Sequence, residues 1–196
     1  GTAVVNGFDV RTQTLQAKAS LGYLPEIPPV YAGMPVEDYL EFAALLHGMP
    51  KGKVKGAVND AMAKCVIHDV RHRLIGNLSK GYRQRVGLAQ AIVHNPPVLI
   101  LDEPTAGVDT PGEQPFYDTI GEVPRRHKLT VVLVSHDLSM VHRHASWVYA
   151  LNGVVCCEGS PEHVMNADSL KEAYGLNVTP YHHHGHSHGP GTGHGQ

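Results

Sequence analysis

The sequence predicts an α/β domain with a mainly parallel sheet and helices on its faces, and two observations support this prediction. Residues 98–101 form an uninterrupted apolar run that is too short for a helix and follows two prolines. Such a run is typical of a strand buried on both faces of a parallel sheet. Asp102 and Glu103 follow it directly, and open α/β sheets bind their ligands at the carboxyl ends of strands. By itself, the acidic pair is also compatible with a solvated turn.

The composition limits what the chain can be. Its 196 residues allow one ordinary domain and a tail, and a hydrophobic content of 42% is enough for a core. The net charge of -2 comes without a basic cluster, which argues against a nucleic-acid partner. No apolar stretch approaches the roughly 20 residues that span a bilayer. The three cysteines have no metal-ligand spacing.

The front half of the chain predicts a short hairpin and two helices. A β stretch at 3–5 turns at Asn6-Gly7, a pair that favours tight hairpin turns. Residues 36–46 are predicted to form a helix. Apolar residues then recur at helical spacing from Val54 to Val66, which predicts a second, amphipathic helix.

The rear half alternates further helices and strands. Ser79 is a suitable N-cap for a helix that begins near Tyr82. A buried strand is predicted at 130–135, with His136 at its carboxyl end. The remaining predictions are a helix at 113–126, a hairpin of strands 147–151 and 154–157 about Asn152-Gly153, and one or two short helices over 161–174.

The last residues have a different composition. Six of the fifteen histidines lie between His182 and His194, among glycines. Such a segment cannot form a core and is expected to be disordered. Imidazole is a good ligand for zinc, copper and nickel, so zinc on this tail is one hypothesis, with His182, His183, His184, His186 and His188 as the candidate ligands. A flexible tail with incidental metal affinity is the other.

Four motifs of this chain resemble those of the ATP-binding-cassette (ABC) ATPases, and they occur in that family's order. Leu78–Arg85, with Leu-Ser-Lys-Gly-Tyr, is similar to the signature motif. Val98–Glu103 resembles the Walker B motif and Ala106–Asp109 the D-loop. His136 resembles the switch histidine. The resemblance implies a P-loop NTPase-like fold that hydrolyses ATP with magnesium.

The resemblance assigns catalytic roles to residues at the strand ends. Glu103 would polarise the attacking water, and His136 would contact the γ-phosphate. Asp102 would hold magnesium through water. Glu26 stands where the family usually has the Gln of its Q-loop. In the family, the Q-loop senses magnesium and the transmembrane partner. The carboxylate of Glu26 still offers oxygen to a metal or water.

The resemblance also implies a composite site between two subunits. Ser79, Lys80, Gly81 and Tyr82 would serve the nucleotide held by the opposite subunit, because a helix N-terminus presents free N–H groups to an anion. Asp109 would couple the two sites. The implied partners are a second ATPase subunit, arranged head to tail, and a transmembrane permease subunit. No nucleic acid is expected.

One departure from the family is large. The phosphate-binding loop GxxxxGK[ST] is absent: the only Gly-Lys pair, Gly52-Lys53, is followed by Val54. We therefore expect an N-terminally truncated domain, with a partial ABC ATPase domain over 1–176, a helical subdomain at about 36–95, and a His/Gly-rich tail over 177–196. This fragment alone is expected to be inactive.

The two halves of the chain resemble different transporters. The signature and residues 23–48 are similar to the ATPases of ABC-2-type exporters, whereas the segment from Ala106 onward is similar to zinc and manganese importers, which often end in a His-rich tail. The longer rear match favours a metal importer at the cytoplasmic face of the membrane. Three alternatives remain: an exporter ATPase, a truncated non-catalytic metal-binding or interaction module, and a non-transport ABC ATPase.

Overall fold

The computed structural model describes residues 1–106, 120–121 and 129–166. The chain divides into two compact units, Gly1–His144 and Ala145–Gln196. Each unit is described by itself below. The predicted boundary of the tail at 176/177 lies outside the described residues and stays a prediction.

The first unit begins with a small hairpin. Strands β1 (Val4–Val5) and β2 (Phe8–Asp9) pair antiparallel. Asn6 and Gly7 between them have φ of 50° and 83°, the left-handed backbone of a tight hairpin turn, which confirms the predicted turn. A short helix that the sequence pattern did not predict, α1 (Thr14–Ala19), follows and buries only Ala17.

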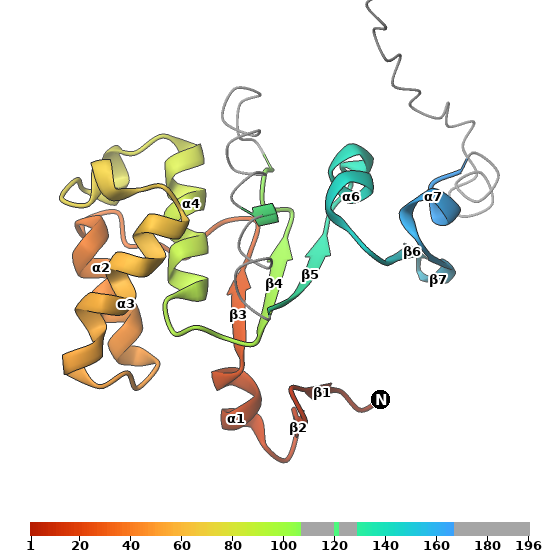
Figure 1. Cartoon of the computed structure of the whole chain (residues 1–196), viewed down its shortest axis with the longest axis horizontal. Helices are drawn as coiled ribbons and strands as arrows, with labels where there is room; N and C mark the ends of the chain where they lie inside the picture. Colours follow the sequence, from red (N-terminus) through yellow and green to blue (C-terminus); the bar gives the residue numbers. More distant parts are fainter. Residues whose placement is uncertain (107–119, 122–128, 167–196) are drawn as a thin grey trace, which may run out of the picture. The chain divides into compact units, whose positions relative to one another are not determined.

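The predicted parallel sheet is confirmed. Strands β3 (Leu21–Leu24), β4 (Val98–Asp102) and β5 (Thr130–Val134) are hydrogen-bonded in the order β3-β4-β5, and both pairings are parallel. Figure 1 shows β4 between its two neighbours. In register, Asp102 pairs with Val134, so the residues that follow β4 and β5 emerge at the same edge of the sheet.

The prediction that residues 98–101 are buried on both faces is wrong, because Val98 and Ile100 are only half-buried, and the strand predicted as buried at 130–135 is partly exposed as well. Leu24, Leu99 and Leu101 on one face are fully or almost fully buried. On the other face, Val132 and Val134 remain 46% and 50% exposed. The reason is physical: helices cover the first face, and within the described residues nothing covers the second as completely.

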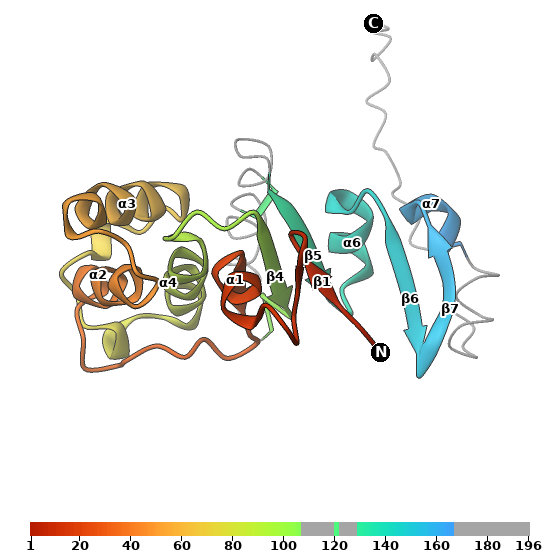
Figure 2. The ribbon, with the colours of Figure 1, turned by 90° about the horizontal axis from the view of Figure 1, so that it is seen from below.

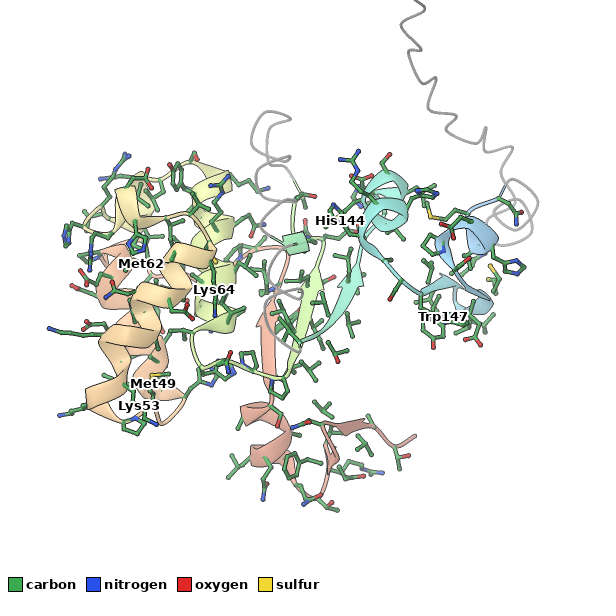
Figure 3. All side chains as sticks on the ribbon, in the orientation of Figure 1. Met49, Lys53, Met62, Lys64, His144 and Trp147 are labelled. Carbon is green, nitrogen blue, oxygen red and sulfur yellow. The ribbon has the colours of Figure 1, made fainter. Side chains whose placement is uncertain are left out.

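A helical layer follows β3 in sequence. It consists of α2 (Val36–Leu46), α3 (Lys51–Lys64) and α4 (Lys80–Ile92), with the 3-10 turns η1 (His68–Val70) and η2 (Ile75–Asn77) between α3 and α4. The three helices lie against one another in both views of the ribbon (Figures 1 and 2). Met62 of α3, labelled in Figure 3, is fully buried among them.

The helix α4 joins this layer to the sheet by packing directly against β3. A Cβ placed at Gly22 of β3 would overlap the backbone oxygen of Ala91 in α4. Only glycine allows the strand and the helix to approach this closely. The position of α4 relative to the sheet is therefore fixed by backbone contact as well as by side chains.

Helix α6 (Leu138–His144) begins after β5 and closes the first unit. In the second unit, β6 (Val148–Asn152) and β7 (Val154–Gly159) pair antiparallel about Gly153, as predicted, and α7 (Pro161–Val164) packs on them. Trp147, labelled in Figure 3, is exposed at the start of this unit. Of the helix predicted at 113–126, only Ile120 and Gly121 lie in the described residues, and both are helical. None of the described helices is long and apolar enough to cross a membrane.

Candidate functional site

The site is built around Glu103, the first residue after β4. Its φ of 43° is in the left-handed region, where a residue other than glycine is uncommon. Two backbone hydrogen bonds hold it there: the N–H of Glu103 donates to the carbonyl of Val134 at 2.9 Å, and the N–H of Ala106 donates to the carbonyl of Glu103 at 3.0 Å. Backbone strain that the surroundings enforce is concentrated at functional sites, which makes Glu103 a candidate on geometric grounds.

His136, two residues beyond β5, is the partner of Glu103. Its Nδ1 lies 2.8 Å from Oε2 of Glu103. The His136 side chain is 83% exposed and that of Glu103 is 23% exposed, so the imidazole is open to solvent while the carboxylate is largely enclosed. The hydrogen bond to Glu103 and its negative charge raise the pKa of His136 above its ordinary value of 6.5. The structure thus brings together the two residues predicted to be catalytic.

Asp102 is the last residue of β4, next to this pair. Its Oδ2 accepts a hydrogen bond of 3.3 Å from the hydroxyl of Tyr23 on the neighbouring strand. Burial, followed by the negative charge of Asp102, raises the pKa of Tyr23. A carboxylate that is half-exposed at the end of a strand is a ligand type that suits magnesium. Tyr23 was not singled out from the sequence, because its pairing with Asp102 depends on the strand register.

The predicted signature residues lie at the start of α4. The Oγ of Ser79 accepts from the N–H of Tyr82 at 3.3 Å, which confirms Ser79 as the N-cap. The hydroxyl of Tyr82 donates to Oδ2 of Asp69 at 2.6 Å. Ser79 and Lys80 are exposed and Gly81 is half-buried. Among the described contacts, no hydrogen bond or ion pair joins these residues to Glu103 or His136.

Glu26 lies on the loop after β3, and its side chain is exposed. The pKa of His136 is raised mainly by Glu103 and then by Asp137. The negative charge of Glu26 raises it by a smaller amount, so Glu26 is within electrostatic range of the site. Its backbone carbonyl accepts a hydrogen bond of 2.8 Å from Nε2 of Gln84 in α4. Gln84 lies within the signature-like segment Leu78–Arg85 but was assigned no role there, because its contact with Glu26 joins residues far apart in the chain.

Several predicted site residues fall outside the described part of the chain: Asp109, His182, His183, His184, His186 and His188. Among the residues that are described, no group of three His, Cys, Asp or Glu side chains is arranged to hold a metal ion. The roles predicted for Asp109 and for the histidine tail therefore stay predictions.

Comparison with known families identifies the domain. The family described as "ABC transporter" matches residues 1–106, more than half of the chain. This chain belongs to the ABC transporter family. The matched range includes the signature segment, β4 and Glu103, so the ABC motifs and the geometry described above coincide.

Within the ABC family, the chain is similar to curated zinc import ATP-binding proteins. The chain is 37% identical over 170 residues to the zinc import ATP-binding protein ZnuC of Pseudomonas entomophila, covering 85% of this chain and 64% of that protein. It is 36% identical over 179 residues to ZnuC of Pseudomonas savastanoi, covering 90% and 66%. The chain thus spans slightly less than two thirds of the length of these relatives.

Solved ABC structures have the same fold. The chain matches cbiO1 of Clostridium perfringens, part of the ABC transporter complex cbiONQ, with a TM-score of 0.76 and 24% identity, over 85% of this chain and 68% of that one. It matches a putative metal-chelate type ABC transporter with a TM-score of 0.73 and 22% identity, over 81% and 65%. At these identities the likeness shows the fold alone.

Proposed function

We propose that this ABC protein is the ATP-binding subunit of a zinc importer and that the complete subunit hydrolyses ATP. The 2.8 Å pair of Glu103 and His136 at the carboxyl ends of two adjacent parallel strands carries the proposal of hydrolysis. The similarity to zinc import ATP-binding proteins over 85–90% of the chain supports zinc as the transported ion.

Each site residue has a distinct task in this proposal. Glu103 orients and polarises the attacking water, while His136 donates a hydrogen bond to the γ-phosphate and holds the Glu103 carboxylate in place. Asp102 would hold magnesium through water, and magnesium, when bound, neutralises charge on the phosphate oxygens. Tyr23 limits the rotation of Asp102 through its hydrogen bond. Glu26 supplies a further carboxylate at the border of the site.

The proposal includes two protein partners. A second ATPase subunit, placed head to tail, would present its own Ser79–Tyr82 segment to the nucleotide, and Asp109 would link the two sites. The exposure of Ser79 and Lys80 at the N-terminus of α4 supports such a contact. A transmembrane permease would bind the pair of subunits at the cytoplasmic face of the membrane.

The histidine-rich tail is proposed to bind zinc. Three or four of its imidazoles can reach one tetrahedral zinc ion, although ordering the chain opposes binding. We expect modest affinity that weakens steeply below about pH 6, where imidazoles are protonated. Zinc titration by calorimetry of the whole chain and of a chain ending at Tyr181 tests this. The shortened chain should lose the binding, and equal binding by both would contradict it.

The function is tested in the natural full-length protein with its permease. Membrane vesicles that contain the complex should take up radioactive zinc when ATP is supplied, and the same complex with Glu103→Gln should not. Glu41→Gln is a matched control: it is the same substitution at a half-buried position of α2, outside the strand ends that carry Glu103 and His136. Zinc uptake that proceeds equally with Glu103→Gln, or a wild-type complex that hydrolyses ATP without moving zinc, would overturn the proposal.

A further inference from the structure

Gln84 is the one polar side chain of α4 that is fully buried. It has no exposed surface, and its Nε2 donates to the backbone carbonyl of Glu26 at 2.8 Å. Its Oε1 is buried without a partner among the described residues. Leaving an acceptor unpaired in the interior is unfavourable. The chain thus retains a polar group at a core position, where an apolar residue would avoid this cost.

The same stretch of loop is held against α4 by close packing. Gly87 lies one turn after Gln84, on the same face of the helix. A Cβ at Gly87 would lie 2.7 Å from Cβ of Pro28 and 2.8 Å from Cδ1 of Leu24. Both neighbours flank Glu26 in sequence, so the loop is fixed to α4 by a hydrogen bond at Glu26 and by steric contact on either side of it.

This contact connects two parts of the candidate site. The Glu26 carboxylate is in electrostatic range of His136. The N-terminus of α4, capped by Ser79, lies little more than one turn before Gln84. Gln84 and the signature residues Lys80–Tyr82 belong to one continuous helix of 13 residues. The loop that carries Glu26 is therefore attached to the same helix that presents the signature segment.

We infer that Gln84 is a positioning residue: it fixes the Glu26 loop to the helix that carries the signature segment and so holds the Glu26 carboxylate in place beside the site. It acts on the chemistry through Glu26 and touches no reacting atom. The inference rests on the proposed ATPase function, and it gives a role to Gln84, a residue of the signature-like segment Leu78–Arg85 that the resemblance left without one.

The test is a double-mutant cycle in the full-length protein. Gln84→Leu keeps the volume of the side chain and removes the donor, and Glu26→Ala removes the carboxylate. We expect Gln84→Leu to lower turnover about tenfold, as is usual when a group that orients a site residue is lost. The affinity for ATP should change by less than about twofold, because a positioning residue affects the transition state of hydrolysis more than the binding of the nucleotide. In the Glu26→Ala background, Gln84→Leu should have no further effect.

Gln90→Leu is the matched control: it is the same substitution in the same helix, at a half-buried position. It should keep turnover near that of the wild type. Hydrogen exchange measured without nucleotide gives a second readout. Gln84→Leu should accelerate exchange in residues 24–30 only, whereas a general loss of stability would accelerate it throughout α4 and β4 as well. Gly87→Ala, which acts by steric repulsion, should show the same pattern.

The outcomes separate the two proposals. Turnover of Gln84→Leu equal to that of Gln90→Leu, or effects of Gln84→Leu and Glu26→Ala that multiply independently, would overturn the role of Gln84 and leave the ATPase intact. A wild-type protein that hydrolyses no ATP would overturn the proposed function, and the role of Gln84 with it.

Discussion

The imidazole of His136 holds its proton more strongly than a free imidazole because the Glu103 carboxylate accepts its hydrogen bond. We expect the pKa of His136, measured by NMR titration, to lie above 6.5 in the wild type and to fall toward 6.5 in Glu103→Gln. A folded-state pKa above the unfolded value means that the pair stabilises the fold below about pH 6.5 and that this contribution is lost as pH rises through the raised pKa. An unchanged His136 titration in Glu103→Gln would show that the pair does not form in solution.

Glu103 itself should separate nucleotide binding from turnover. In the full-length protein, Glu103→Gln keeps the shape of the side chain and its hydrogen-bonding oxygen but removes the base. Turnover should fall by about 10²–10⁴-fold, while ATP binding, followed with a fluorescent analogue, should be retained. Near wild-type turnover would mean that Glu103 is not the base and that another carboxylate activates the water.

At the scale of elements, a pair of stacked histidines connects the helical layer to the sheet. His47 follows the last residue of α2, and His94 lies between α4 and β4; their rings are parallel within 5° with centroids 3.6 Å apart. Burial is the main cause that lowers the pKa of His94 to about 4, and the charge of the neighbouring His47 adds to it. Burial also lowers the pKa of His47. Both rings are therefore neutral in the folded protein at neutral pH.

This stack should make the fold sensitive to acid. The unfolded histidine has a pKa near 6.5, so stability is lost as pH falls from about 6.5 toward 4. The substitution His94→Phe retains a ring that stacks but does not titrate. Between pH 7.5 and pH 5, the variant should therefore lose about 1 kcal/mol less of its unfolding free energy than the wild type, after allowance for solvent screening. Urea unfolding at pH 7.5 and pH 5 measures it. His68→Phe, at an exposed position, should leave the acid sensitivity as it is.

The sequence predicted the elements with strong local signals and missed those that depend on distant partners. The helix at 36–46 and the N-cap at Ser79 were predicted correctly because apolar spacing and capping are local. The helix α1 was missed because six residues with one buried side chain show no periodicity. The contact of Gln84 with Glu26 joins residues 58 positions apart, and no local pattern reports it. The exposure of Val132 was missed because an apolar strand does not reveal which of its faces is covered.

The whole chain provides one further test. It lacks the GxxxxGK[ST] loop, whose backbone N–H groups and lysine supply most phosphate contacts in P-loop proteins. We expect the 196-residue chain alone to bind Mg-ATP very weakly and to show no ATPase activity. Calorimetry and a phosphate-release assay measure the two quantities. Micromolar binding by this chain would show that other residues hold the phosphates.

The exposed face of the β3-β4-β5 sheet has a consequence for the behaviour of the chain in solution. Tyr23 of β3 and Val132 and Val134 of β5 form an apolar strip on this face, on either side of β4, and all three are about half exposed. The net charge of -2 gives little mutual repulsion between molecules near neutral pH. Contacts between such strips are short-ranged, so their effect grows with concentration. This strip therefore adds to the exposed apolar surface through which copies of the chain associate, and we expect association to increase with protein concentration.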